Sequence, residues 1–160
     1  MSALSAQKKG FTLTEMLVTL TILAILAGAV MPLAKAAIKR EKEIELRRNL
    51  RLIRESIDAY KKLADEKKIK VEEDTEGYPP NLEALVKGVE VKEEKSGKAA
   101  TRIVKFLRRI PKDPMTESFD WGLRSYQDDP DAEIWGEENV YDVYTKSRGT
   151  ALDGTRYKDW

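Results

Sequence analysis

An uncharged stretch from Met16 to Ala34 is preceded directly by one acidic residue, Glu15. As an α-helix this stretch would be about 30 Å long, which matches the thickness of the hydrocarbon core of a bilayer. An ionised carboxylate within hydrocarbon costs at least ~2.5 kcal/mol, so an acidic residue there is expected to be paired and functional. The sequence therefore predicts a membrane-spanning helix in which Glu15 needs a cation.

A cation for Glu15 becomes available if the chain is cut between Gly10 and Phe11. Phe11 would then carry a free α-amino group four residues before Glu15, about one helical turn away. The two charges can pair within one chain, or between neighbouring chains that are staggered by about one turn. Since the second arrangement joins one chain to the next, we predict that Phe11 and Glu15 serve subunit assembly.

The residues around this junction form a motif: the basic pair Lys8-Lys9, then Gly10 and Phe11, and Glu15 at the fifth position after the cut. This motif closely resembles the leader junction of type IV pilins and of type II secretion pseudopilins. The resemblance implies that a membrane-embedded prepilin peptidase cleaves after Gly10 and methylates the new N-terminal Phe11.

Two simpler interpretations of the N-terminal region remain open. A secretory signal sequence could be cleaved after Ala34-Lys35-Ala36, but its apolar core would be too long and would contain Glu15. A plain single-pass anchor with Glu15 at the membrane surface would not explain the Gly10-Phe11 junction. On either interpretation Lys8-Lys9 places the N-terminus in the cytoplasm and the chain beyond the span outside.

The composition limits the function of the remaining chain. Its 29 basic and 28 acidic residues give a net charge of +1, so no strong field favours nucleic acid. There is no cysteine and no histidine, which excludes disulfides, the usual zinc sites and a Ser-His-Asp triad. No motif for carboxylate, hydroxyl or lysine catalysis is present, so we predict a protein that is not an enzyme.

Beyond the uncharged stretch, apolar residues recur at intervals of three and four. They are Leu46, Leu50, Ile53, Ile57, Tyr60 and Ala64. This spacing is typical of the buried face of an amphipathic helix, which we expect to pack on a sheet. Charged residues fill the other positions, and Glu43 and Arg47 have the i, i+4 spacing of a surface ion pair.

Nothing interrupts a helix before Lys67, so the sequence predicts one long helix from Phe11 to about Asp65. Pro32 lies inside it and removes one backbone hydrogen bond, which predicts a bend there. Pro32 also matches a proline that pilin-like proteins carry in their first helix.

Shorter elements follow the long helix. Asn81 is a good N-cap for a helix over Leu82–Lys87, which Gly88 would end. Residues 90 to 100 are polar, with a loop predicted at Ser96-Gly97, and a second short helix is predicted over Ala100–Leu107.

The last predicted elements are strands. Residues 121 to 126 and 139 to 145 alternate apolar with polar side chains, as half-buried strands do. Two or three strands after one long helix predict an α+β fold.

These later segments extend the resemblance over the whole chain. Tyr78-Pro79, the run from Phe106 to Pro114 and the strand from Val140 to Tyr144 are similar to the head of the major pseudopilins, the G subunits, of type II secretion systems. The resemblance implies a type IV pilin-like fold, in which the long N-terminal helix packs on a small antiparallel sheet. It also implies a leader at 1–10, a transmembrane assembly helix at 11–37 and a periplasmic head at 38–160.

By the same resemblance the chain is a structural subunit of the bacterial inner membrane, single-pass, with its N-terminus cytoplasmic and its head periplasmic. It would assemble into a helical homo-polymer, a periplasmic pseudopilus that drives protein export through an outer-membrane secretin. The other partners implied are minor pseudopilins, the inner-membrane assembly platform and the cytoplasmic secretion ATPase.

Two other functions remain open. The first is a subunit of an extended type IV pilus, although the cysteine pair that many such pilins use in their C-terminal loop is absent here. The second is a membrane-anchored periplasmic binding domain, for which the sequence contains no glycine-rich loop or convergent polar cluster.

The C-terminal loop, residues 151 to 160, has two interpretations. Major pseudopilins bind calcium in this loop, and the resemblance implies that Asp153 and Asp159 would supply the carboxylate ligands. Alternatively, Asp153-Gly154 is a tight turn, and Tyr157 and Trp160 dock the loop on the sheet.

Overall fold

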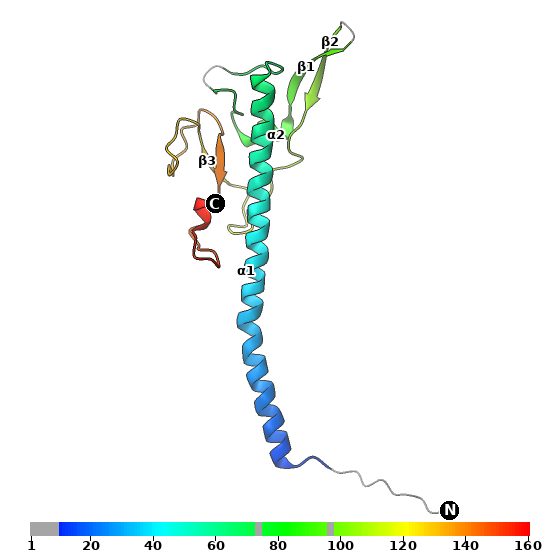
Figure 1. The fold of residues 1–160 in the computed structure, drawn as a ribbon, viewed down its shortest axis with the longest axis vertical. Coiled ribbons are helices and arrows are strands. Elements are labelled where there is room, and N and C mark those ends of the chain that lie inside the picture. The colour runs from blue at the N-terminus through cyan, green and yellow to red at the C-terminus, as the bar shows by residue number, and fades with distance from the viewer. Residues whose placement is uncertain (1–9, 73–74, 96–97) are drawn as a thin grey trace, which may run out of the picture. The chain divides into compact units, whose positions relative to one another are not determined.

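The computed structural model describes residues 10–72, 75–95 and 98–160, and the chain divides into two compact units. Unit 1 is Met1–Lys39 and unit 2 is Arg40–Trp160. The elements are α1 (Leu13–Asp65), α2 (Leu82–Lys87), β1 (Val89–Lys95), β2 (Lys98–Val104), β3 (Gly122–Arg124), β4 (Asp142–Tyr144) and the 3₁₀ turn η1 (Tyr157–Asp159). One long helix with small antiparallel sheets is an α+β arrangement (Figure 1), which confirms the predicted fold class.

The predicted long helix is confirmed, and it ends at Asp65 as expected. In unit 2 every residue of the predicted apolar stripe is buried, from Leu46 at 0% exposed to Ala64 at 8%. The stripe forms one hydrophobic cluster with buried residues from α2, β1, β4, η1 and the segments between the elements. These are Leu82, Leu85, Val91, Leu107, Trp121, Val140, Val143, Ala151 and Tyr157. The core of unit 2 is therefore built around the second half of α1.

The capped helix α2 is also confirmed. The side chain of Asn81 accepts a hydrogen bond from the backbone N–H of Ala84 at 2.9 Å. Gly88 ends the helix at φ 86°, a left-handed conformation that glycine adopts without steric cost, and its N–H donates to the carbonyl of Ala84. The caps hold a six-residue helix that would not be stable alone.

Replacing Asn81 with alanine should destabilise the protein by about 1 kcal/mol, because the N–H of Ala84 loses its acceptor. Thermal unfolding measures the loss, and Asn81→Asp, which keeps an acceptor, is the control. Equal stability of the alanine and aspartate variants would contradict the capping role.

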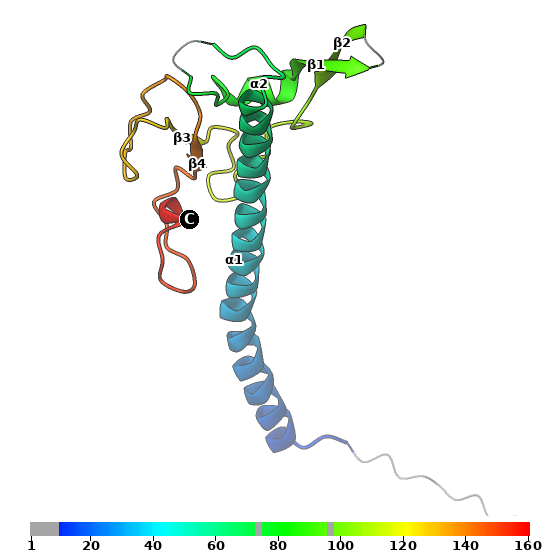
Figure 2. The same cartoon turned by 45° about the horizontal axis from the view of Figure 1, so that its top comes forward.

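The second predicted helix, over Ala100–Leu107, is wrong. Residues 100–104 belong to β2, which pairs antiparallel with β1 in a hairpin near the C-terminal end of α1 (Figure 2), and residues 105–107 follow the strand without helical structure. Val91 of β1 is buried in the core, and the N–H groups of Phe106 and Leu107 both donate to the carbonyl of Leu85. Pairing with the preceding strand has thus overridden the local helix preference. The loop predicted at Ser96-Gly97 lies outside the described residues.

The two predicted strands are confirmed, although each is shorter than expected. β3 and β4 pair antiparallel, with Gly122 opposite Tyr144. A side chain at Gly122 would collide with the ring of Tyr144, which in turn lies 4.2 Å from the guanidinium of Arg124. Glycine is therefore required at this position for the close approach of the ring.

A buried carboxylate, Asp113, organises the segment that joins the two sheets. It is 0% exposed and accepts hydrogen bonds from the N–H of Met115 and from the hydroxyls of Thr116 and Thr145. A buried charge is tolerated when donors surround it in this way, and this one joins the segment to the end of β4.

Candidate functional site

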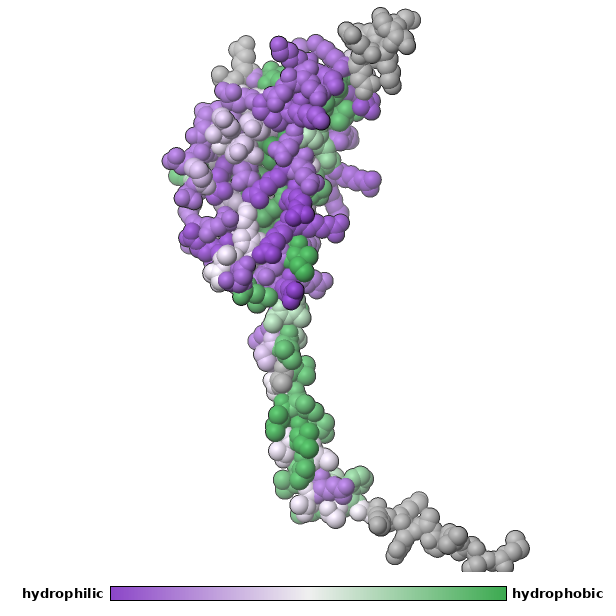
Figure 3. Space-filling model, in the orientation of Figure 1, coloured by the Kyte–Doolittle hydropathy of each residue, from purple (hydrophilic) through white to green (hydrophobic). Residues whose placement is uncertain are grey.

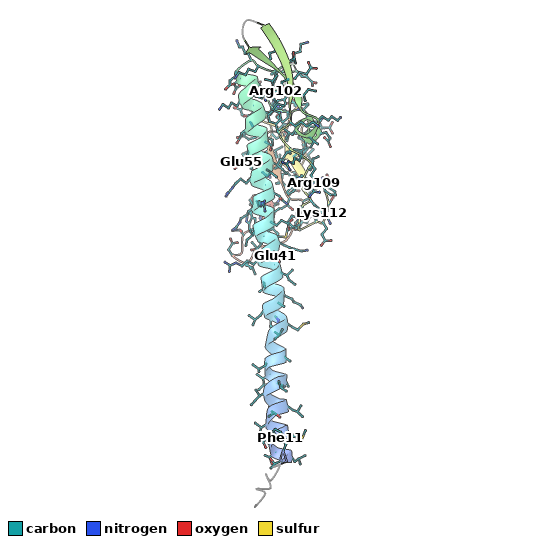
Figure 4. All side chains as sticks on the ribbon, turned by 90° about the vertical axis from the view of Figure 1, so that its right-hand side faces the viewer. Phe11, Glu41, Glu55, Arg102, Arg109 and Lys112 are labelled. Carbon is teal, nitrogen blue, oxygen red and sulfur yellow. The ribbon has the colours of Figure 1, made fainter. Side chains whose placement is uncertain are left out.

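The predicted processing site lies immediately before α1. Phe11 is 77% exposed at this position (Figure 4), and Thr12 is the residue that caps the helix. The hydroxyl of Thr12 accepts a hydrogen bond from the N–H of Glu15 at 3.2 Å. A Thr three residues before a Glu is the sequence signature of a capping box, and sequence reasoning could have found this cap from the spacing alone. Lys8-Lys9 lie outside the described residues.

Glu15 occupies the first turn of α1. The unpaired N–H groups and the helix dipole at this end favour a negative charge, so the first turn is a suitable place for a carboxylate. Phe11, which would carry the amino group after cleavage, lies just before the same turn. The structure thus places Phe11 and Glu15 at one end of the helix, as the assembly hypothesis requires.

Gly10 is exposed, and a Cβ added there would meet no described atom within 4 Å. The described part of the chain therefore has no packing reason for glycine at this position. A requirement for glycine would come from a partner that binds the junction.

The face of the unit 1 helix seen in Figure 3 is mainly apolar, with a few polar residues, among them Glu15 and Lys35, exposed on the helix. Each of the following side chains is more than half exposed: Met16, Leu17, Val18, Leu20, Ile22, Leu23, Ile25, Leu26, Val30, Met31 and Leu33. An exposed apolar surface of this extent indicates burial against lipid or against other protein. Within the described residues, α1 is the one helix long and apolar enough to cross a membrane, by length and composition only.

Two threonine hydroxyls inside this helix are satisfied locally. The hydroxyl of Thr19 donates to the carbonyl of Met16 at 2.9 Å, and that of Thr21 donates to Leu17 at 2.7 Å. Hydroxyls bonded to their own helix need no water, which suits a hydrocarbon environment. Pro32 lies within α1, and the bend expected there stays a prediction.

Residues 5–31 match the family model of the prokaryotic N-terminal methylation motif. The match supports a type IV pilin-like protein. It includes Gly10, Phe11 and Glu15, so it covers the junction described above. No curated protein and no solved structure shows significant similarity to the chain. The apolar helix and the motif together are consistent with membrane anchoring.

Asp153 and Asp159, the two predicted metal ligands, are not part of a metal-binding cluster. Among the described residues, no group of three or more His, Cys, Asp or Glu could hold a metal ion. Asp153 contacts Arg47 at 3.4 Å, and Asp159 contacts Arg156 at 2.9 Å. Each carboxylate therefore already has a protein cation beside it.

The tail, which we define as residues 149–160, contacts α1 through side chains that sequence reasoning did not single out as a site. Glu43 and Arg47, predicted as a surface ion pair, reach instead to Tyr157 and Asp153. Tyr157 is buried at 4% exposed, and Trp160 packs edge-on against it with 5.1 Å between ring centroids. The two aromatic residues do dock the tail, but these contacts are with α1 and not only with the sheet.

Proposed function

We propose that this chain is a structural subunit of a type II secretion pseudopilus, made as a precursor and processed after Gly10 by prepilin peptidase. The observation that carries the proposal is the extensive exposed apolar surface of α1 between Met16 and Leu33, with Glu15 in the first turn of the helix. A secreted soluble domain has no use for such a surface, whereas a subunit needs it twice, first against lipid and then against neighbouring helices.

In this proposal the α-amino group of Phe11, methylated after cleavage, pairs with Glu15 across neighbouring subunits. The pair removes the cost of leaving an isolated carboxylate in hydrocarbon, which is at least ~2.5 kcal/mol, so assembly is favoured over the dispersed state. Repeating one head-to-tail contact that does not close produces a helical filament. A bend at Pro32 would let the helices follow the filament axis.

The surface of unit 2 is compatible with contacts between like subunits. Exposed acidic side chains, such as Glu41 and Glu55, project from α1, and exposed basic ones, such as Arg109 and Lys112, follow β2 (Figure 4). A surface with both signs can meet a second copy of itself without strong repulsion.

The proposed topology has the N-terminus in the cytoplasm and unit 2 in the periplasm, with the pseudopilus formed from the inner membrane. The proposed partners are the peptidase, minor pseudopilins, the assembly platform, the secretion ATPase and the outer-membrane secretin. The ATPase supplies the energy, and the chain itself is proposed to have no enzymatic activity.

Deletion of the gene tests this function. We expect exported proteins to remain in the periplasm while surface fibres are unaffected, and the wild-type gene, but not Gly10→Val, to restore export. Normal export with loss of surface fibres would favour an extended type IV pilus instead. If export and fibres are both normal and the chain is not cleaved, a membrane-anchored binding domain becomes the better interpretation.

A further inference from the structure

The tail forms a closed turn by its own hydrogen bonds. The N–H of Ala151 donates to the carbonyl of Thr155 at 2.7 Å, and Gly154 completes the turn at φ 88°. One carboxylate oxygen of Asp153 accepts from both the N–H and the hydroxyl of Thr155, at 3.0 and 2.6 Å. These bonds, first that of the hydroxyl and then that of the backbone, lower the pKa of Asp153, so it is ionised at neutral pH.

The second carboxylate oxygen of Asp153 contacts the guanidinium of Arg47 at 3.4 Å. The same guanidinium lies 3.9 Å from the ring centroid of Trp160, whose indole N–H donates to the hydroxyl of Thr155. An exposed ion pair alone contributes little, but stacking on an aromatic ring fixes the guanidinium in position. The guanidinium of Arg47 is therefore held between the carboxylate of Asp153 and the ring of Trp160, and it places a positive charge beside the turn.

Glu43 lies one helical turn before Arg47, and its buried side chain binds the tail by hydrogen bonds. It is only 7% exposed, and one carboxylate oxygen accepts from the N–H of Leu152 and the hydroxyl of Tyr157, each at 2.9 Å. Burial, and then the bond to Glu43, raise the pKa of Tyr157 to about 12, so this phenol remains protonated and keeps donating. Losing this acceptor would leave the buried phenol of Tyr157 without its partner and would also free the N–H of Leu152.

Arg54, seven residues after Arg47 on the same face of α1, holds the end of the tail. Its guanidinium donates to the backbone oxygen of Trp160 at 2.7 Å and to Asp142 of β4 at 2.7 Å. One face of α1 therefore binds the tail at Glu43, Arg47 and Arg54 in succession.

Calcium in this loop would need six to eight oxygen ligands. The carboxylates present are Asp153, with both oxygens in use, and Asp159, which is paired with Arg156. A dication would have to displace Arg47 from its place against Trp160 and would meet Arg156 nearby. The two carboxylates that could bind a metal ion are thus already bonded to other groups of the same chain.

We propose that the tail is a metal-independent clasp on α1: the buried carboxylate of Glu43 anchors it, and the guanidinium of Arg47 supplies the positive charge. The clasp lies within one chain, so it holds whether or not the subunit assembles as proposed above.

The test uses the full chain in detergent, with tryptophan fluorescence to follow thermal unfolding. We expect the same midpoint in millimolar calcium and in excess chelator. A rise with calcium that chelator reverses would overturn the proposal, and this measurement needs no variant.

Variants then test the two side chains. Arg47→Gln should lower the midpoint by roughly 5 °C, whereas Arg51→Gln, an exposed arginine one turn away, should not. Trypsin should cleave the Glu43→Ala variant after Arg156 about tenfold faster than wild type, because local opening of the tail becomes easier. Glu45→Ala is the exposed control for that change. If each variant behaves like its control, α1 does not clasp the tail.

Discussion

Replacing Gly10 with valine is expected to leave the chain as an uncleaved, full-length precursor. The structure gives no internal reason for glycine at this position, since a Cβ would meet no described atom within 4 Å. Valine should therefore leave the fold intact and act only by filling the space that the peptidase needs beside the scissile bond. Intact-mass measurement of protein from membranes distinguishes the precursor from a mature chain that begins at a methylated Phe11.

Gly28 provides a matched control, because a Cβ there also meets no described atom within 4 Å. Gly28→Val should be processed normally. A wild-type chain that begins at Ala37 would instead support the secretory signal, with cleavage after Ala34-Lys35-Ala36. Absence of any cleavage in the wild type would support the plain anchor.

Replacing Glu15 with valine is expected to abolish assembly without preventing membrane insertion. The substitution makes the helix more apolar, so insertion should if anything improve. The amino group of Phe11 then has no counter-charge in the next subunit, and burying it unpaired is costly. Chemical cross-linking of overexpressed subunits in membranes should give monomers where wild type gives a ladder.

The control for this experiment is Thr21→Val, which also makes the helix more apolar but removes no charge. Its hydroxyl donates to the carbonyl of Leu17 within its own helix, so its ladder should match that of wild type. A full ladder from the Glu15 variant would show that the ion pair does not drive assembly, even if the subunit forms a filament by other contacts.

The elements that were predicted correctly are those determined by neighbouring residues. The end of α1 at Asp65, the buried stripe from Leu46 to Ala64 and the cap at Asn81 all depend on spacings of a few positions. The predicted leader junction is likewise a contiguous motif that lies within the residues matched by the methylation-motif model, and cleavage after Gly10 stays a prediction. All the residues that form such a pattern lie within a few positions of one another, so the pattern can be read from a short segment of the sequence.

The elements that were missed depend on partners outside their own segment, some close in sequence and some far away. β2 has alanines and charged residues that favour a helix, but Arg102 is paired with Val91 across the hairpin and Ile103 with Glu90. Glu43 and Arg47 have the spacing of a surface pair, yet their partners lie in the tail, more than 100 positions away. Side chains of this kind can satisfy several geometries, and the sequence alone does not select among them.

The distance in sequence between α1 and the tail also affects the order in which the protein can fold. The contacts of Arg47 with Asp153 and of Glu43 with Tyr157 join residues 106 and 114 positions apart. At ribosomal speeds of about 5–20 residues per second, the stripe on α1 is made on the order of 10 s before Ala151 and Tyr157 exist to help cover it. A chain that stops short of residue 157 would keep part of this stripe uncovered and would be open to proteases. The tail must therefore reach the same side of the membrane as the stripe before the core around α1 can be fully covered.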